Sequence, residues 1–475
     1  MTPAIPSPEH GSVANRLERL PFCGWHRTLC ALLVGAFMFE FIDLYTFAFS
    51  APALVVHLGF TVPDIGTITA AAGIGAFVGA FVGGWAAGRI GRKPTLVACL
   101  VMFSVPSLLN ALVSTPEWFI VLRFFTGIGY QGTTVVGGIL LSELVPGHVR
   151  GRAFAWVNAI GGLGPALLAW LAFAVVPQFT WGWRVLYLVG GLGLLLVVPF
   201  LRRLPESPRW LESRGATDRA RATTAQIEAA VRTEGHIIPE GIVTAHTEPY
   251  EGTTTGQPNG LGALFRQGFG RQFAVTCALW TLGVVGYFGF TAWLSTLLKL
   301  KGYTISEGAF ITAVITTVGM IGLLASTVVT DRWQRRYSLA VISTVLGVTA
   351  LLFTTSDSTV IVLGLGCVLQ VLYQMTVPLT QAYSAEVFPT RFRAIGSGWA
   401  SSSGRLGSIL GTFAITAILG ALGISAVFYF IAVVMLVLAL TMAVFGQSTT
   451  GSLEENTEQS PANSPDSTSS LTDVA

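Results

Sequence analysis

SELVPGHVR at residues 142–150 and AEVFPTRFR at residues 385–393 are two versions of one segment, each at the end of an apolar run, and they lie 243 positions apart (385 − 142 = 243). Glu, Pro and Arg keep the same places in both versions. The same spacing separates GGLGP, which begins at Gly161, from GRLGS, which begins at Gly404. Matches at one spacing predict two homologous halves. Such repeats are typical of membrane transporters whose binding site lies between the halves, near the middle of the bilayer.

The composition favours a protein embedded in a membrane. Of the 475 residues, 52% are hydrophobic and only 11% are charged, whereas about a quarter of the residues are charged in an ordinary soluble domain. The mean hydropathy is +0.66. A net charge of +3 is too small to indicate nucleic-acid binding, and the five cysteines have no metal-ligand spacing. We expect reduced, structural thiols in a protein whose main surroundings are the lipid bilayer.

Twelve apolar runs are long enough to cross a bilayer, which takes about 20 residues in a helix. The sequence therefore predicts an all-α polytopic membrane protein with twelve transmembrane helices in two pseudo-symmetric six-helix bundles. The predicted spans cover residues 27–56, 64–88, 94–114, 117–142, 150–176, 183–202, 271–298, 305–330, 338–355, 359–385, 394–421 and 424–446.

Polar stretches divide the chain into five parts. We predict a cytoplasmic N-terminal segment at 1–26, a first bundle at 27–202, a cytoplasmic linker at 203–270, a second bundle at 271–446 and a disordered cytoplasmic tail at 447–475. The linker contains one helix-like stretch, DRARATTAQIEAAVR, and the tail lacks basic residues and apolar periodicity. No cleavable signal peptide is expected, because the first apolar run is too long for one.

Basic residues fall in every second loop between the spans, which marks those loops as cytoplasmic. The alternate loops are almost free of Lys and Arg, and only Lys299 and Lys301 break this pattern. The pattern predicts a multi-pass protein of the cell membrane with both termini in the cytoplasm.

GWAAGRIGRK at 84–93 resembles the loop signature of the major facilitator superfamily, Gly-x-x-x-Asp-Arg-x-Gly-Arg-Lys, except that Gly88 stands where the family has Asp. The cluster returns after Asp331, again 243 positions later. RFFTGIG at 123–129, SELVPGHVRGR at 142–152, LPESPRWL at 204–211 and AEVFPTRFRAIGSG at 385–398 are similar to segments of the sugar-porter-related branch. The resemblance implies the major facilitator fold and transport by alternating access. That branch includes proton symporters for niacin, aromatic acids and similar organic anions.

Two acids in the first span, Glu40 and Asp43, lie three residues apart on one helical face of FEFIDLY. A carboxylate inside the bilayer is costly and is commonly part of a proton or solute pathway. The pair resembles the Asp-x-x-Asp of aromatic-acid and niacin permeases. We predict that these acids, Asp43 foremost, carry the coupled proton. The alternative is a structural role in which both acids are hydrogen-bonded to neighbouring helices.

Arg123 lies inside the fourth span, and the matching position of the second half is Gly366. This asymmetry indicates a task that only one half performs. In related sugar porters the arginine of this motif pairs with the acid of the first span. We therefore predict that Arg123 pairs with deprotonated Asp43 and is released when Asp43 is protonated. The alternative is a packing arginine held by carbonyl groups.

Arg405 is a second arginine deep in an apolar run, and it can either bind the carboxylate of an anionic solute or serve a structural or gating role. Polar and aromatic residues of the spans are candidates for the wall of a solute cavity. Each of them could instead join helices or anchor the membrane interface. These candidates are Tyr45, Tyr130, Gln131, Asn158, Tyr287, Trp293, Gln370, Tyr373, Gln374 and Gln381.

Charged residues at the cytoplasmic helix ends form a predicted gate, closed in the outward-facing state. The basic residues after span two would pair with acids at neighbouring helix ends, and Glu143 would pair with Arg150 and Glu386 with Arg393. The alternative role, that of topology signals, is compatible with this one. The predicted gate residues are Arg89, Arg92, Lys93, Glu143, Arg150, Asp331, Arg332, Glu386 and Arg393. Glycines in spans two and four are expected to allow close helix packing.

No motif indicates an enzyme, a cofactor or a metal site, because the sequence has no phosphate-binding GxxxxGK[ST], no HExxH and no Cys/His cluster. We predict a monomeric secondary active transporter that takes up a small organic solute with a proton. The preferred solute is an organic anion such as an aromatic or nicotinate-like carboxylate. Alternatives are a sugar:proton symporter, a proton-coupled exporter, suggested by Gly164 and Pro165, and a membrane sensor that transports nothing.

Overall fold

The computed structural model describes residues 12–239, 261–355 and 358–447. The first eleven residues, part of the linker and nearly all of the predicted tail lie outside the described residues. Twelve segments of the described chain are long and apolar enough to cross a membrane, and the described part contains helices but no strand. This confirms the predicted fold class.

The first bundle follows the short helix α1 (Val13–Glu18). Its six spans are formed by α2 (Gly24–Leu58), α3 (Val62–Ile90), α4 (Arg92–Asn110), α5 (Pro116–Leu144), the pair α6 (Gly147–Gly161) and α7 (Gly164–Val175), and the pair α8 (Gly182–Gly191) and α9 (Val197–Arg203), which the 3₁₀ turn η2 (Leu192–Leu196) joins.

The linker contains α10 (Pro208–Ser213), α11 (Thr217–Thr233) and α12 (Leu261–Arg266), and α11 covers the stretch predicted to be helical. The second bundle consists of α13 (Gly270–Thr291), α14 (Leu294–Leu300), α15 (Ile305–Arg332), α16 (Arg335–Thr355), α17 (Thr359–Glu386), α18 (Thr390–Leu422) and α19 (Ile424–Phe445).

Two turns repeat the 243-residue spacing in three dimensions. They are GFTVPD at 59–64, between α2 and α3, and GYTISE at 302–307, between α14 and α15. The first glycine of each turn has a positive φ, 71° in one and 104° in the other, a conformation that glycine adopts without strain. The threonine of each turn donates its backbone N–H to the acid three residues later, at 2.8 and 2.9 Å. The same cap therefore starts the second span of each half.

Glycines bring α3 and α5 into backbone contact, as predicted from the sequence. A Cβ atom at Gly79 would lie 2.7 Å from Ile128 Cα, and one at Gly83 would lie 2.9 Å from Gly132 Cα. Real Cβ atoms do not approach other atoms so closely. Only small residues permit this packing, which is common between membrane helices.

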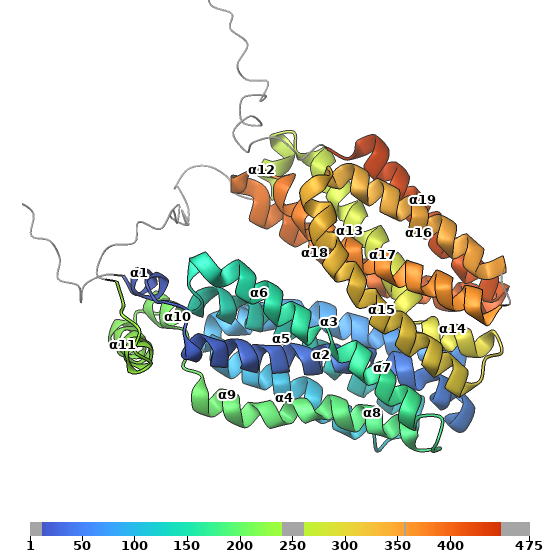
Figure 1. Cartoon of the computed structure of the whole chain (residues 1–475), viewed down its shortest axis with the longest axis horizontal. Helices are drawn as coiled ribbons and strands as arrows, with labels where there is room; N and C mark the ends of the chain where they lie inside the picture. The colour runs from blue at the N-terminus through green and yellow to red at the C-terminus, as the bar shows by residue number, and fades with distance from the viewer. Residues whose placement is uncertain (1–11, 240–260, 356–357, 448–475) are drawn as a thin grey trace, which may run out of the picture.

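The two bundles lie side by side at one end of the molecule and diverge toward the other (Figure 1). We call the end with α1, α10 and α12 the inner end, and the end with the turns at 59–64 and 302–307 the outer end. Between the middle of the bundles and the outer end, the Tyr45 and Tyr287 hydroxyls share a hydrogen bond of 2.7 Å across the interface. Trp170 Nε1 donates to Thr317 Oγ1 at 3.0 Å. These contacts close the outer end.

Candidate functional site

The Asp43–Arg123 pair lies in the interior of the first bundle. Arg123 Nη1 on α5 donates to Asp43 Oδ2 on α2 at 3.1 Å and to the Asp43 carbonyl oxygen at 3.0 Å. The side chains are 2% and 0% exposed, respectively. The structure thus brings the two predicted partners together. Removal of either partner would leave a buried charge uncompensated.

Close packing surrounds the second oxygen of Asp43. A Cβ atom at Gly190 on α8 would lie 3.3 Å from Asp43 Oδ1 and 2.8 Å from Ser107 Oγ. The absence of a side chain at Gly190 therefore leaves room for the Asp43 carboxylate and the Ser107 hydroxyl. No sequence pattern pointed to these two neighbours, since they come from helices far away in the chain.

Glu40 lies one turn before Asp43 and is 5% exposed. Its Oε1 accepts a hydrogen bond from Thr134 Oγ1, whereas its buried Oε2 has no hydrogen-bond partner among the described residues. Glu40 is close enough to Arg405 of α18, in the second bundle, for a favourable Coulombic interaction. The predicted proton carrier and the predicted anion-binding arginine therefore approach each other across the interface.

We call Glu40, Asp43, Arg123 and Arg405 the central charge cluster. Tyr130 is within electrostatic range of all four. Two acids and two arginines balance in charge, so that mutual attraction offsets part of the cost of burial. Addition of one proton to the central charge cluster leaves it with a net positive charge.

A cavity of about 160 Å³ lies within the second bundle between α13, α16, α17 and α19. The Ser343 and Tyr373 hydroxyls belong to its wall and are buried without a hydrogen-bond partner among the described residues. None of the side chains that line it is charged. We call it the C-terminal cavity, and its walls include Trp280, Tyr287, Phe288, Ser343, Tyr373 and Thr380. An apolar cavity of about 150 Å³ can hold a benzene ring.

The structure gathers only part of the predicted solute-binding set. Tyr287 and Tyr373 line the C-terminal cavity, and Tyr45 bonds to Tyr287. Asn158 Nδ2 donates to the Phe154 carbonyl within its own helix at 2.9 Å, which fits the alternative, structural role.

The remaining predicted wall residues lie apart from this cavity. Gln370 is buried and packs where a Cβ of Gly319 would stand, and Trp293 is buried with its Nε1 lacking a hydrogen-bond partner among the described residues. Gln131 and Gln374 are half-buried and Gln381 is exposed. None of these five side chains lines the C-terminal cavity.

Each bundle has an ion pair at its inner end, and the two pairs are equivalent. Arg92 Nη2 pairs with Glu143 Oε1 at 2.6 Å, and Arg335 Nη2 with Glu386 Oε1 at 2.9 Å. Both residues of the second pair follow those of the first by 243 positions. The predicted pairs of Glu143 with Arg150 and of Glu386 with Arg393 are not formed in this conformation, because each acid pairs instead with the arginine that follows the second span of its half.

The other predicted gate residues make local contacts. The Arg89 guanidinium lies 5.5 Å from the centre of the Trp85 ring, and Lys93 Nζ donates to the Leu201 carbonyl at 2.8 Å. Arg393 Nε is buried without a hydrogen-bond partner among the described residues. The side chains of Asp331 and Arg332 lie outside the described residues.

The linker packs against the loop that follows α3. The Gly88 carbonyl accepts hydrogen bonds from Trp210 Nε1 at 2.8 Å and Arg214 Nη2 at 2.6 Å. Glu206, just before α10, accepts from the backbone N–H groups of Arg92 at 2.9 Å and Lys93 at 3.2 Å. An acid thus still caps the loop after α3, but it comes from the linker.

Glu18 joins α1 to the inner end of the first bundle. It accepts hydrogen bonds from Arg150 Nη2 at 2.5 Å, from Arg209 Nη2 at 2.6 Å and from the Gly147 backbone N–H at 2.6 Å. Burial alone would raise the pKa of the Glu18 carboxyl. The Gly147 hydrogen bond and the two arginines outweigh it and hold this pKa below its usual value. Arg150 therefore pairs with Glu18, a partner that the sequence did not indicate.

Comparison with known proteins agrees with this arrangement. The profile of the Major Facilitator Superfamily matches residues 33–374 and, in a second overlapping match, residues 337–472. The chain belongs to the major facilitator superfamily. This facilitator is therefore a membrane transporter of small solutes and not an enzyme.

Relatives of the facilitator carry names of small-solute transporters. It is 32% identical to YyaJ of Bacillus subtilis, a protein named for metabolite transport, over 92% of this chain and 96% of the relative. It is 28% identical to the niacin transporter NiaP of Acinetobacter baylyi, over 94% of this chain and 99% of the relative. It is 30% identical to the 4-hydroxybenzoate transporter PcaK of Pseudomonas putida, over 82% of this chain and 85% of the relative.

A solved structure shares the facilitator's fold. The xylose transporter XylE of Escherichia coli, in a partially occluded inward-open conformation, superposes with a TM-score of 0.70 over 90% of this chain and 99% of XylE. The two sequences are 17% identical, so that this likeness concerns the fold alone.

Proposed function

We propose that this facilitator is a proton symporter that takes up a small aromatic monocarboxylate by alternating access. The observation that carries the proposal is the central charge cluster, in which the buried Asp43–Arg123 pair lies beside Glu40, and Glu40 interacts with Arg405 of the other bundle. A proton and an anion bound here would each change the balance of the same four charges.

The proton step follows from the geometry of Asp43 and Arg123. Protonation of Asp43 removes the charge that holds Arg123 and frees the guanidinium to change partners. Proton relays built from buried acids are common in transporters. One carboxylate oxygen of Glu40 has no hydrogen-bond partner among the described residues, and the carboxylate interacts electrostatically with Arg405. A solute carboxylate can compete with Glu40 for Arg405, and a protonated Glu40 would no longer compete.

The C-terminal cavity supports an aromatic solute. It has the size of one ring, its walls are mostly apolar, and two buried hydroxyls are free to bond a ring substituent. A Cβ atom at Gly404, next to Arg405, would lie 3.2 Å from atoms of both Trp280 and Val284, which line the cavity. We therefore propose that a ring bound in this cavity directs its carboxylate toward Arg405, the residue that follows Gly404. A sugar would need many more polar partners than these walls offer.

Orientation and location belong to the same proposal. The inner end carries the basic loops, so we assign it to the cytoplasm with both termini, and we assign the monomeric protein to the cell membrane. The names of NiaP and PcaK support an aromatic acid as solute.

Purified protein in liposomes tests the function. Uptake of nicotinate, 4-hydroxybenzoate, benzoate and xylose is measured with and without a pH gradient that is acidic outside. We expect at least one carboxylate to accumulate above its external concentration only with the gradient, and no uptake of xylose. If the gradient drives uptake of xylose and of no carboxylate, the protein is a sugar symporter. If a carboxylate leaves the liposomes only while protons enter, the protein is an exporter.

A further inference from the structure

Lys299 and Lys301 are basic residues near the outer end, in a chain that otherwise confines lysine and arginine mainly to inner loops. Basic residues on the outer side oppose the charge bias that sets topology. The matching positions of the first bundle, 243 residues earlier, are the apolar residues Val56 and Leu58. The two charges therefore occur at these positions in the second bundle alone, and the fold that both bundles share does not require them.

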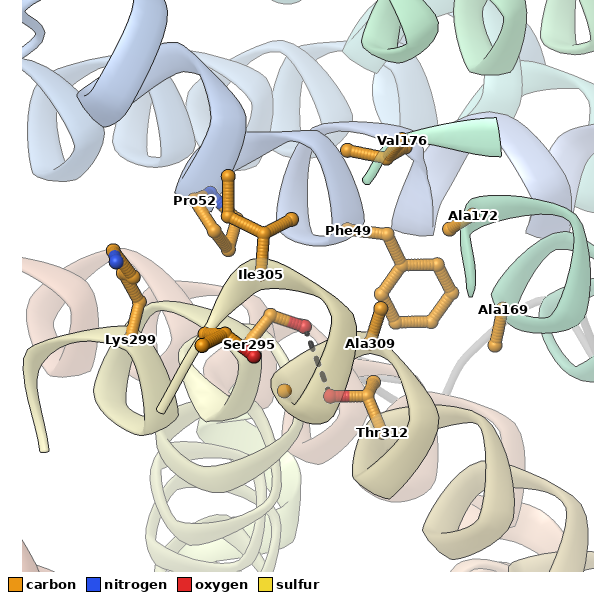
Figure 2. A pocket seen from close by; sticks show the side chains of 12 residues that line it. Phe49, Pro52, Ala169, Ala172, Val176, Ser295, Lys299, Ile305, Ala309 and Thr312 are labelled. Atoms are coloured by element: carbon orange, nitrogen blue, oxygen red, sulfur yellow. Dashed lines mark hydrogen bonds between the residues drawn. The ribbon is translucent and has the colours of Figure 1, made fainter. Parts of the chain in front are cut away.

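Lys299 lies where the two bundles meet. We call Phe49 and Pro52 of α2, Ser295 and Lys299 of α14 and Ile305 of α15 the outer seam, since these residues line one small pocket between the bundles. Figure 2 shows the Lys299 side chain beside Pro52 and Ile305. The pocket has a volume of about 10 Å³, room for a single water molecule. The outer seam is therefore shut in this conformation.

The ammonium group of Lys299 has no acid within ion-pair distance among the described side chains. The nearest acid in sequence, Glu307, accepts from the backbone N–H and hydroxyl of Thr304 at 2.9 and 2.8 Å. Lys301 differs, because its Nζ lies 5.8 Å from the centre of the Phe353 ring. Lys299 is thus a half-buried cation at the interface whose charge is not needed for any ion pair described here.

We propose that Lys299 is an anion-recruitment site at the outer face of the transport path, and this inference rests on the proposed uptake of a carboxylate. When the bundles part at the outer end, α2 moves away from α14 and the seam opens. The ammonium group then faces the external solution and binds the solute carboxylate before it reaches Arg405. A lone cation in a cleft raises the local concentration and the arrival rate of anions.

Polar groups deeper in the same pocket extend this path. The Ser295 and Thr312 hydroxyls share a hydrogen bond of 3.2 Å, drawn as a dashed line in Figure 2. Both side chains are buried while the seam is shut. After opening, these hydroxyls can exchange their mutual bond for bonds to a carboxylate passing inward from Lys299.

The test compares Lys299→Gln with Lys301→Gln, a matched loss of one charge two residues away, in liposomes that take up nicotinate or 4-hydroxybenzoate. We expect Lys299→Gln to raise the KM for external solute roughly fivefold with an unchanged maximal rate, and Lys299→Arg to restore the KM. The rise of the wild-type KM with salt should be absent in Lys299→Gln. The KM for solute leaving from the inside should not change.

Three results would overturn the inference: an external KM of Lys299→Gln equal to that of the wild type, an equal rise in Lys301→Gln, or an equal change of the KM on both sides. The proposed function fails separately. If the wild-type protein moves no carboxylate at all, the symporter proposal is wrong, whereas normal carboxylate uptake by Lys299→Gln removes only the role of Lys299.

Discussion

Asp43 shows how one residue in this chain combines a structural and a chemical demand. A carboxylate that is 0% exposed needs a permanent partner to stay charged. Arg123 supplies it from the fourth span, and Gly190 supplies the space. The partner was predictable from the resemblance of the motif around Arg123 to that of sugar porters, in which this arginine pairs with the acid of the first span. The space at Gly190 was not predictable, since no feature of the α8 sequence indicates that this glycine packs against α2.

Asp43→Asn should separate proton coupling from solute movement. The amide keeps the size of the carboxylate and one acceptor oxygen for Arg123, but it cannot take up a proton. We expect exchange of labelled for unlabelled carboxylate to continue while accumulation driven by the pH gradient is lost. Glu117→Gln, at an exposed position at the start of α5, is the matched control and should accumulate solute normally. Uphill uptake by Asp43→Asn would reject the coupling role of Asp43.

At the scale of helices, apolar runs located all twelve spans, because hydrocarbon imposes a minimum length on any helix that crosses it. The runs did not show where helices break. The predicted span at 150–176 divides into α6 and α7 just before Pro165, which lacks a backbone N–H. The predicted span at 271–298 divides into α13 and α14 at Ala292–Trp293. Hydropathy reports burial in lipid and carries no information on backbone hydrogen bonds.

Gly79 and Gly88 of α3 offer a matched test of helix packing. A Cβ at Gly79 would meet the backbone of Ile128, whereas a Cβ at Gly88 would have nothing within 4 Å. Gly79→Ala should therefore lower the free energy of unfolding by about 1–3 kcal/mol, and Gly88→Ala should leave it unchanged or raise it slightly. Thermal melting in detergent measures both. Equal melting temperatures would contradict the close α3–α5 contact.

Glu18 should make the attachment of α1 dependent on pH. Its pKa is lowered in the folded protein, so the stability it contributes is complete above the ordinary glutamate value of 4.5 and is lost as the pH falls through the lowered value. Glu18→Gln should cost about 1–2 kcal/mol at pH 7. The difference from the wild type should shrink below pH 4.5. A difference that does not change with pH would show that the carboxylate charge is irrelevant.

At the scale of the whole molecule, the two bundles are held together toward the outer end by few polar contacts. The Tyr45–Tyr287 hydrogen bond is one of them. A small number of such bonds suits a transporter, because the closed and open states must differ by only a few kcal/mol to interconvert. The repeat in the sequence predicted two halves, but which end is closed depends on contacts between residues with no sequence signature.

Tyr287→Phe should shift the protein toward the state that is open at the outer end. Loss of one neutral hydrogen bond changes the population about two- to tenfold. Ser295→Cys, placed in a background without the five native cysteines, reports the opening through labelling by a membrane-impermeant maleimide. The labelling rate should rise by that factor. Tyr187→Phe is the control, because Tyr187 bonds to Ser50 within one bundle at 2.9 Å, and equal labelling in both variants would reject a role of the tyrosine pair in closure.

The hydrogen bonds that Trp210 and Arg214 donate to the Gly88 carbonyl fasten α10 to the first bundle, and the Arg16–Glu228 pair at 2.9 Å fastens α11 to α1. We therefore expect α11 to move together with the first bundle in every transport cycle. A fluorophore on α11 would keep a constant distance to α4 and a varying distance to α16. The distance from α11 to α16 would therefore report how far the first bundle tilts relative to the second.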